Sequence, residues 1–149
     1  MPDIEYQIPP VITHSRRSSM DNLDGDYLGW QIRGWMVDQI HKEFGVTGIN
    51  VKVGVGDTGV SKSHTKEGGD LENIVSAKSF IPGENEWDVN GHGSHVAGII
   101  AARKDGTGMR GAAYGITSIV SQRIANDAGS IALSDSTWAS VVDSDRTLN

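Results

Sequence analysis

The segment VKVGVGDTGV, residues 51–60, decides the fold class of this chain. Its valines stand at alternate positions, which is typical of a short β-strand. Asp57 follows the strand directly and begins the tight turn Asp-Thr-Gly, which Thr58 and Gly59 complete. Functional side chains gather at the carboxyl ends of strands in open α/β sheets, so Asp57 is a candidate functional residue. Taken alone, an aspartate directly after a strand is as often a turn-forming residue as a functional one.

Strands and helices alternate along the rest of the chain. Short apolar segments predict strands over residues 51–56, 74–80 and 118–124. Apolar residues at helical spacing predict a helix over residues 91–104, with Asn90 as its cap, and a final short helix with Ser134 as its cap. This alternation predicts an α/β fold with a mostly parallel sheet and helices on its faces.

An arm and a helix precede the first of these strands. Residues 1–26 hold prolines, serines and other polar residues without a period, so we expect an extended arm, either the remnant of a propeptide or a natural extension. The arm has no apolar run of the kind found in a secretory signal. Further on, an apolar residue recurs every four positions and predicts one helix that ends at Gly45. This apolar stripe consists of Leu28, Ile32, Met36, Ile40 and Phe44.

A second distinctive segment, GHGSHVAG, covers residues 91–98. His92 lies between Gly91 and Gly93, and these glycines would let another backbone, such as a substrate strand, come close. An imidazole in this place can transfer protons near neutral pH. His95 follows on nearly the same side of the predicted helix. Without context, two histidines at this spacing are either structural residues or part of a metal site.

Together the two segments resemble the signatures of the subtilisin-like serine proteases. In that family an apolar strand runs into Asp-Ser/Thr-Gly, and a later helix opens with Gly-His-Gly-Thr-His-Val-Ala-Gly, from which this chain departs only at Ser94. The aspartate also precedes the histidine in subtilisin. The resemblance runs from about Gly45 to the chain end. It implies that residues 27–149 are the N-terminal part of a catalytic domain, with a partial three-layer subtilisin-like fold that is truncated.

The resemblance also implies roles for the residues of both segments. Asp57 would orient the imidazole of His92, and His92 would be the general base toward a serine hydroxyl and then the acid toward the leaving amine. The residues that would support this pair are Thr58, Gly59, Gly91, Gly93 and His95. The family's serine lies in a Gly-Thr-Ser-Met-Ala motif that does not occur here, and neither does its oxyanion asparagine. We therefore expect no nucleophile in this chain and no hydrolysis by this chain alone.

Composition and resemblance together define the expected partners. The 149 residues carry a net charge of −6, which argues against a nucleic-acid partner. The most apolar run, residues 96–102, is too short to span a membrane. The resemblance implies that the partner is a peptide or protein substrate and that catalysis needs no cofactor. The resemblance further implies a structural calcium ion at Asp70. Members of the family are mostly secreted.

Two other functions compete with this interpretation. Asp-Thr-Gly after an apolar strand is also the signal of retropepsin-like aspartic proteases, which pair two aspartates by dimerisation. The mechanism of those aspartic proteases assigns no role to the segment GHGSHVAG. A non-catalytic metal-binding module could instead use His92, His95 and an acidic residue, although the spacing reveals no third ligand.

Overall fold

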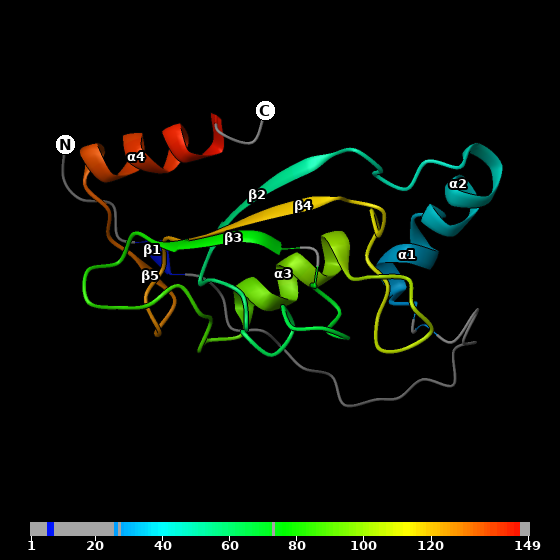
Figure 1. The fold of residues 1–149 in the computed structure, drawn as a ribbon, viewed down its shortest axis with the longest axis horizontal. Helices are drawn as coiled ribbons and strands as arrows, with labels where there is room; N and C mark the ends of the chain where they lie inside the picture. Colours follow the sequence, from blue (N-terminus) through cyan, green and yellow to red (C-terminus); the bar gives the residue numbers. More distant parts are fainter. Residues whose placement is uncertain (1–5, 8–25, 27, 73, 147–149) are drawn as a thin grey trace.

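The computed structural model describes residues 6–7, 26, 28–72 and 74–146. Its centre is a three-stranded parallel sheet in the order β2-β4-β3 (Figure 1). These strands are β2 (Lys52–Asp57), β4 (Ser118–Arg123) and β3 (Ile74–Ser79). All three predicted strands are therefore confirmed, and so is their parallel arrangement. Asp57 lies opposite Arg123, its neighbour on the central strand.

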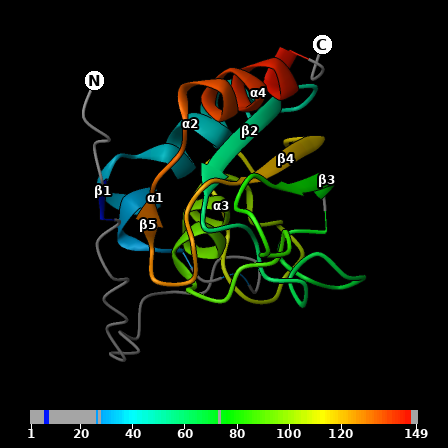
Figure 2. The same ribbon diagram turned by 90° about the vertical axis from the view of Figure 1, so that its left-hand side faces the viewer.

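Helices cover both faces of the sheet, which confirms the predicted three-layer α/β fold. Helix α3 (His92–Ala101) lies on one face and helix α4 (Asp135–Arg146) on the other (Figures 1 and 2). The central strand β4 is buried along its whole length because it has neighbours at both edges and on both faces. The main apolar core consists of Val55, Val60, Leu71, Ala97, Ala101, Ile116 and Ile119.

The predicted single helix over the apolar stripe is wrong. Two short helices stand there instead, α1 (Trp30–Gly34) and α2 (Val37–Phe44). Met36 between them adopts a left-handed conformation with φ 57°, which ends the regular helical course and turns the chain. Consequently Leu28 and Ile32 are buried, whereas the last three members of the stripe are 43–70% exposed. The predicted end at Gly45 is confirmed, since this glycine terminates α2 at φ 64°.

Helix α3 also differs from its prediction at both ends. Its N-cap is Gly91, in a left-handed conformation with φ 98°, and not Asn90. The helix ends three residues before the predicted position 104, because Ala102 takes an extended conformation and the N–H of Arg103 donates to the carbonyl of Asp70 at 3.0 Å. The loop that carries Asp70 therefore captures the chain where the helix stops.

Two smaller features complete the fold. Strand β1 (Tyr6–Gln7) pairs antiparallel with β5 (Ser130–Ile131), so this piece of the predicted arm is extended; of its other residues, only Asp26 lies within the described part. Ser134 accepts the N–H of Thr137 at 3.2 Å, which confirms its predicted capping of α4. Within the described residues no helix is both long and apolar enough to cross a membrane.

Candidate active site

The carboxylate of Asp57 is held at the end of β2, on the face of the sheet that α3 covers. Asp57 is only 8% exposed. Its Oδ1 accepts the N–H of Thr58 at 2.7 Å, and its backbone carbonyl accepts the N–H of Ile124 at 2.8 Å. The backbone bond fixes the strand end against β4, and the turn bond fixes the carboxylate. The side chain therefore has a defined direction before any partner is considered.

His92 is the first residue of α3, and its side chain meets this carboxylate. Its Nδ1 lies 2.9 Å from both Oδ1 and Oδ2 of Asp57. Since the carboxylate can only accept, Nδ1 carries the proton in this contact, and Nε2 of the neutral ring is left as a proton acceptor. The imidazole is partly exposed, with 22% of its side chain accessible. The arrangement can thus accept a proton from a group that approaches Nε2.

Two glycines allow the strand end and the helix start to approach this closely. A Cβ on Gly93 would lie 2.1 Å from the carbonyl oxygen of Gly59, and a Cβ on Gly59 would lie 2.6 Å from the carbonyl oxygen of Glu86. The sequence predicted that a backbone would pass close to Gly93, but the backbone beside it here is the protein's own Asp-Thr-Gly turn. A Cβ on Gly91 would have open space within 4 Å, so its φ of 98° is the reason for glycine there.

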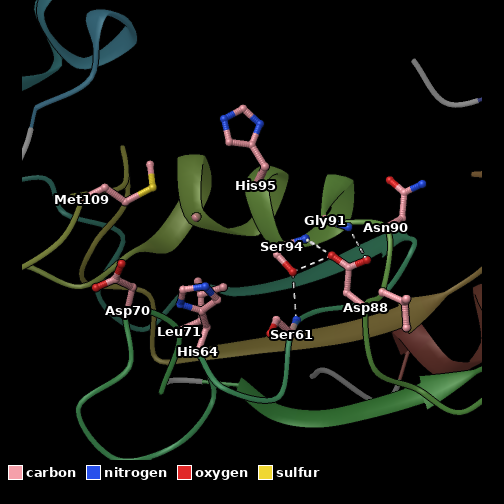
Figure 3. A pocket seen from close by; sticks show the side chains of 12 residues that line it. Ser61, His64, Asp70, Leu71, Asp88, Asn90, Gly91, Ser94, His95 and Met109 are labelled. Atoms are coloured by element: carbon pink, nitrogen blue, oxygen red, sulfur yellow. Dashed lines mark hydrogen bonds between the residues drawn. The ribbon is translucent and has the colours of Figure 1, made fainter. Parts of the chain in front are cut away.

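Asp88 is a residue that the sequence analysis missed. Its carboxylate accepts the N–H groups of Gly91 and Ser94 and the hydroxyl of Ser94 (Figure 3). It also accepts the hydroxyl of Thr58, which makes four hydrogen bonds. These bonds join the loop before α3, the first turn of α3 and the turn after β2. The available signal was an aspartate three residues before the N-cap of a helix, a position from which a carboxylate can reach free N–H groups.

Arg123 is a second missed residue, and it is 1% exposed on the central strand. Its guanidinium contacts the carboxylates of Glu84 and Asp127. It also donates to the backbone carbonyls of Asn85 at 3.0 Å and Trp87 at 2.5 Å. A buried arginine with these partners ties the loop that leads to Asp88 to the loop that follows β4.

A cavity of about 660 Å³ lies beside α3, and neither Asp57 nor His92 lines it. Two residues with predicted roles, His95 and Asp70, do line it, together with the exposed His64. His95 is exposed, and its ring points away from Asp88 and Ser94 (Figure 3). The described residues contain no group of three His, Cys, Asp or Glu side chains suited to a metal ion. The alternative of a metal-binding module therefore gains no third ligand from the described part of the chain.

Asp70 has the type of donor that calcium prefers, because Ca²⁺ binds carboxylate and carbonyl oxygens, six to eight of them in general. Its carboxylate lies against Gly108, where a Cβ would be 2.5 Å from Oδ1. A site at Asp70 would have to take most of its ligands from backbone carbonyls, since no second and third acidic side chains gather there among the described residues.

Ser94 stands closest in sequence to His92 among the serines, but it serves another purpose. Its hydroxyl donates to Asp88 at 2.5 Å and accepts the N–H of Ser61 at 2.9 Å. Both of these bonds lie within the loop network, and neither is directed at the imidazole.

The fold and the site together define a class of protein: an α/β protein that presents a carboxylate–imidazole pair between the end of a parallel strand and the start of a helix. The family model described as the subtilase family matches residues 48–142, more than half of the chain. The chain belongs to the subtilase family and has a partial subtilisin-like fold. This membership contradicts the alternative of a retropepsin-like aspartic protease, and in the structure the partner of Asp57 is a histidine and not a second aspartate.

Several characterised proteases are similar to this chain. Subtilisin DY of Bacillus licheniformis is 45% identical over 87 residues, which cover 58% of this chain and 30% of that protein. The alkaline protease of Alkalihalobacillus alcalophilus is 38% identical over 108 residues, 72% of this chain and 27% of the protease. The major intracellular serine protease of Bacillus subtilis (strain 168) is 38% identical over 92 residues, which cover 58% of this chain and 28% of that protease. The chain therefore spans less than a third of the length of these relatives.

Proposed function

We propose that this chain supplies the aspartate and histidine of a serine-type endopeptidase that acts on peptide or protein substrates. The observation that carries the proposal is the 2.9 Å contact between His92 Nδ1 and the carboxylate of Asp57, two residues that stand 35 positions apart. Both residues come from the two segments that resemble the family signatures, and the chain belongs to the subtilase family.

In this mechanism His92 removes the proton from a serine hydroxyl through Nε2 while the oxygen attacks the substrate carbonyl. The proton then passes from Nε2 to the amine that leaves, and the same steps repeat with water to release the acyl group. Asp57 keeps the ring in the tautomer with Nδ1 protonated and stabilises the imidazolium that forms. The partial exposure of His92 is consistent with an approach of substrate and nucleophile from the open side of the ring.

The nucleophile must come from outside residues 1–149. In subtilisin, loss of the serine alone costs about 2 × 10⁶ in kcat, so a chain with only the other two residues should not cleave peptides at a useful rate. The supporting residues assigned here are Thr58, Gly59, Gly91, Gly93 and His95. We further propose Asp70 as the one side-chain ligand of a structural calcium ion.

A chimeric protease tests this function directly. Residues 48–142 replace the corresponding segment of Subtilisin DY, so that the relative supplies the serine. We expect the chimera to hydrolyse casein and to be blocked by a serine-directed inhibitor. Mutation of His92 to Ala should lower kcat by about 10⁶ and mutation of Asp57 to Ala by about 10⁴, which are the sizes of the corresponding losses in subtilisin.

The matched control is His64→Ala, which removes an exposed histidine of the same segment and should leave kcat within a few-fold. Circular dichroism and thermal unfolding establish that each variant is folded. A folded, active chimera whose kcat is unaffected by His92→Ala would overturn the proposal, as would a folded chimera without activity.

A further inference from the structure

The distance between Asp57 and His92 depends on how the first turn of α3 sits against the turn after β2. A helix start has N–H groups without partners inside the helix, and these usually bond to a side chain at the N-cap. The N-cap of α3 is Gly91, which has no side chain to offer. Something else must hold this helix start in place.

Side chains from three places supply the missing acceptors. Asp88 accepts the N–H groups of Gly91 at 2.8 Å and Ser94 at 2.9 Å. Asn90 accepts the N–H of His92 at 3.3 Å. The N–H of Gly93 donates to the hydroxyl of Thr58 at 2.9 Å. Of these four bonds, the last is the one that reaches across to the turn after β2.

The bond across the gap depends on Asp88 because of its direction. The hydroxyl of Thr58 accepts from Gly93, so its own hydrogen is free for Asp88 Oδ1, 2.9 Å away. The hydroxyl of Ser94 likewise accepts from Ser61 and donates to Asp88 Oδ2. These two hydroxyls and the N–H groups of Gly91 and Ser94 are therefore all donors to Asp88, and only an ionised carboxylate can accept all four bonds. An asparagine here would present an amide NH₂ to at least one donor.

We propose that Asp88 is a positioning residue for the Asp57–His92 pair, acting through Thr58 and the first turn of α3. Its carboxylate orients the Thr58 hydroxyl, and that hydroxyl holds Gly93 and hence the neighbouring His92 against the turn that begins with Asp57. The negative charge also suits the positive end of the helix dipole. The inference rests on the proposed function of Asp57 and His92, and it adds a second carboxylate, that of Asp88, which lies in neither signature segment.

Nuclear magnetic resonance of the ¹⁵N-histidine-labelled chain tests the geometry without any need for activity. In the parent chain we expect a downfield Nδ1 proton of His92 that exchanges slowly with water, because the carboxylate shields it. Asp88→Asn should remove this signal or speed its exchange with water by at least about 10-fold, since the Nδ1 proton would lose a hydrogen bond to a charged acceptor, which corresponds to about 10-fold or more in the opening equilibrium. The matched control is Asp105→Asn, which removes another loop carboxylate bonded to a nearby threonine but remote from this pair.

A second pair of variants keeps the test decisive if Asp88→Asn fails to fold. Thr58→Ser retains a hydroxyl and should keep the Nδ1 signal, whereas Thr58→Val removes the hydroxyl at nearly the same volume and should lose it. In the chimera, Thr58→Val and Asp88→Asn should each lower kcat about 100-fold with little change in KM. A purely structural role would instead lower the active fraction and leave the kcat of the folded enzyme unchanged.

The outcomes separate this inference from the proposed function. If Asp57→Ala, which removes every acceptor oxygen of this side chain, leaves the Nδ1 signal of His92 intact, the pair itself is wrong. If Asp57→Ala abolishes the signal while Asp88→Asn and Thr58→Val both preserve it, the pair stands and the positioning role of Asp88 is wrong. Loss of the signal in Thr58→Ser as well as in Thr58→Val would show that the hydroxyl is not the element that matters.

Discussion

Replacement of Gly93 by alanine should push the start of α3 away from the turn after β2. The added Cβ would lie 2.1 Å from the carbonyl oxygen of Gly59 and 3.1 Å from Oδ1 of Asp57. Non-bonded carbon and oxygen atoms keep a separation of about 3 Å or more, so the helix start would have to retreat by about 1 Å. Because the obstructing oxygen belongs to the backbone, no side-chain rotation can relieve the contact.

The energetic balance of this change is unfavourable. Overpacking of this kind costs about 1–3 kcal/mol. Alanine in place of glycine in a helix returns at most about 1 kcal/mol. We therefore expect Gly93→Ala to lower the free energy of unfolding by up to about 3 kcal/mol, and the midpoint of thermal unfolding by about 3 °C for each kcal/mol. A retreat of about 1 Å would also break the 2.9 Å contact between His92 and Asp57.

Urea unfolding followed by tryptophan fluorescence measures the first effect, and the Nδ1 proton resonance of His92 measures the second. Gly98→Ala is the matched control, since Gly98 is a buried glycine of the same helix. Its added Cβ would meet the sulfur of Met109 at 3.2 Å, and that flexible side chain can move. The control should be neutral or up to about 1 kcal/mol more stable than the parent. A Gly93→Ala chain as stable as Gly98→Ala, with the Nδ1 signal retained, would refute the reasoning.

Four further predictions concern other parts of the molecule. Arg123→Met should lower the free energy of unfolding in urea by about 3–5 kcal/mol, because the loss of the buried cation leaves carboxylates and carbonyls without their donor. The control Arg146→Met removes an exposed arginine and should lower it by less than about 0.5 kcal/mol. Equal effects of the two variants would contradict the role of the buried side chain. The hydroxyl and the N–H of Thr107 hold the pKa of Asp105 below 3.8, so the carboxylate stabilises the fold above that pH and this contribution is lost as the pH falls through the lowered value. Thr107→Val should thus destabilise the chain slightly near neutral pH, and a difference that persists in strong acid would argue against this origin. Calcium should raise the midpoint of thermal unfolding of the parent chain, and a chelator should reverse this increase. In the Asp70→Asn variant calcium should leave the midpoint unchanged, and an increase equal to that of the parent chain would exclude Asp70 as a ligand. Finally, the purified chain should not hydrolyse casein, and turnover that a serine-directed inhibitor blocks would show that a nucleophile is present.

The strands of the central sheet and the Asp57–His92 pair could be predicted from sequence. Alternating valines identified β2 because the period of a strand is a local property. Each residue of the pair lies in a short, recognisable segment. Asp57 begins a turn directly after a strand, and His92 stands between two glycines at the start of a helix. The family resemblance then linked two segments that no local pattern connects.

The break at Met36 could not be predicted in the same way. The spacing of the apolar stripe suits one continuous helix, and methionine is a good helix former. In the folded chain Met36 adopts a left-handed conformation, and Phe44 at the end of the stripe is 70% exposed. The course of the backbone at this point depends on how the two helices pack against the rest of the protein, which helical periodicity does not contain.

The sequence by itself determined the three strands of the central sheet, the helices α3 and α4, the α/β class and the two residues of the candidate pair, because these depend on neighbours within a few positions or on motifs of adjacent residues. Only the tertiary structure decided that Asp88 holds the start of α3, that Arg123 joins two loops and that Gly93 makes room for Gly59. The physical reason is that each of these roles consists of contacts between segments far apart along the chain, and such contacts exist only after the sheet has brought those segments together.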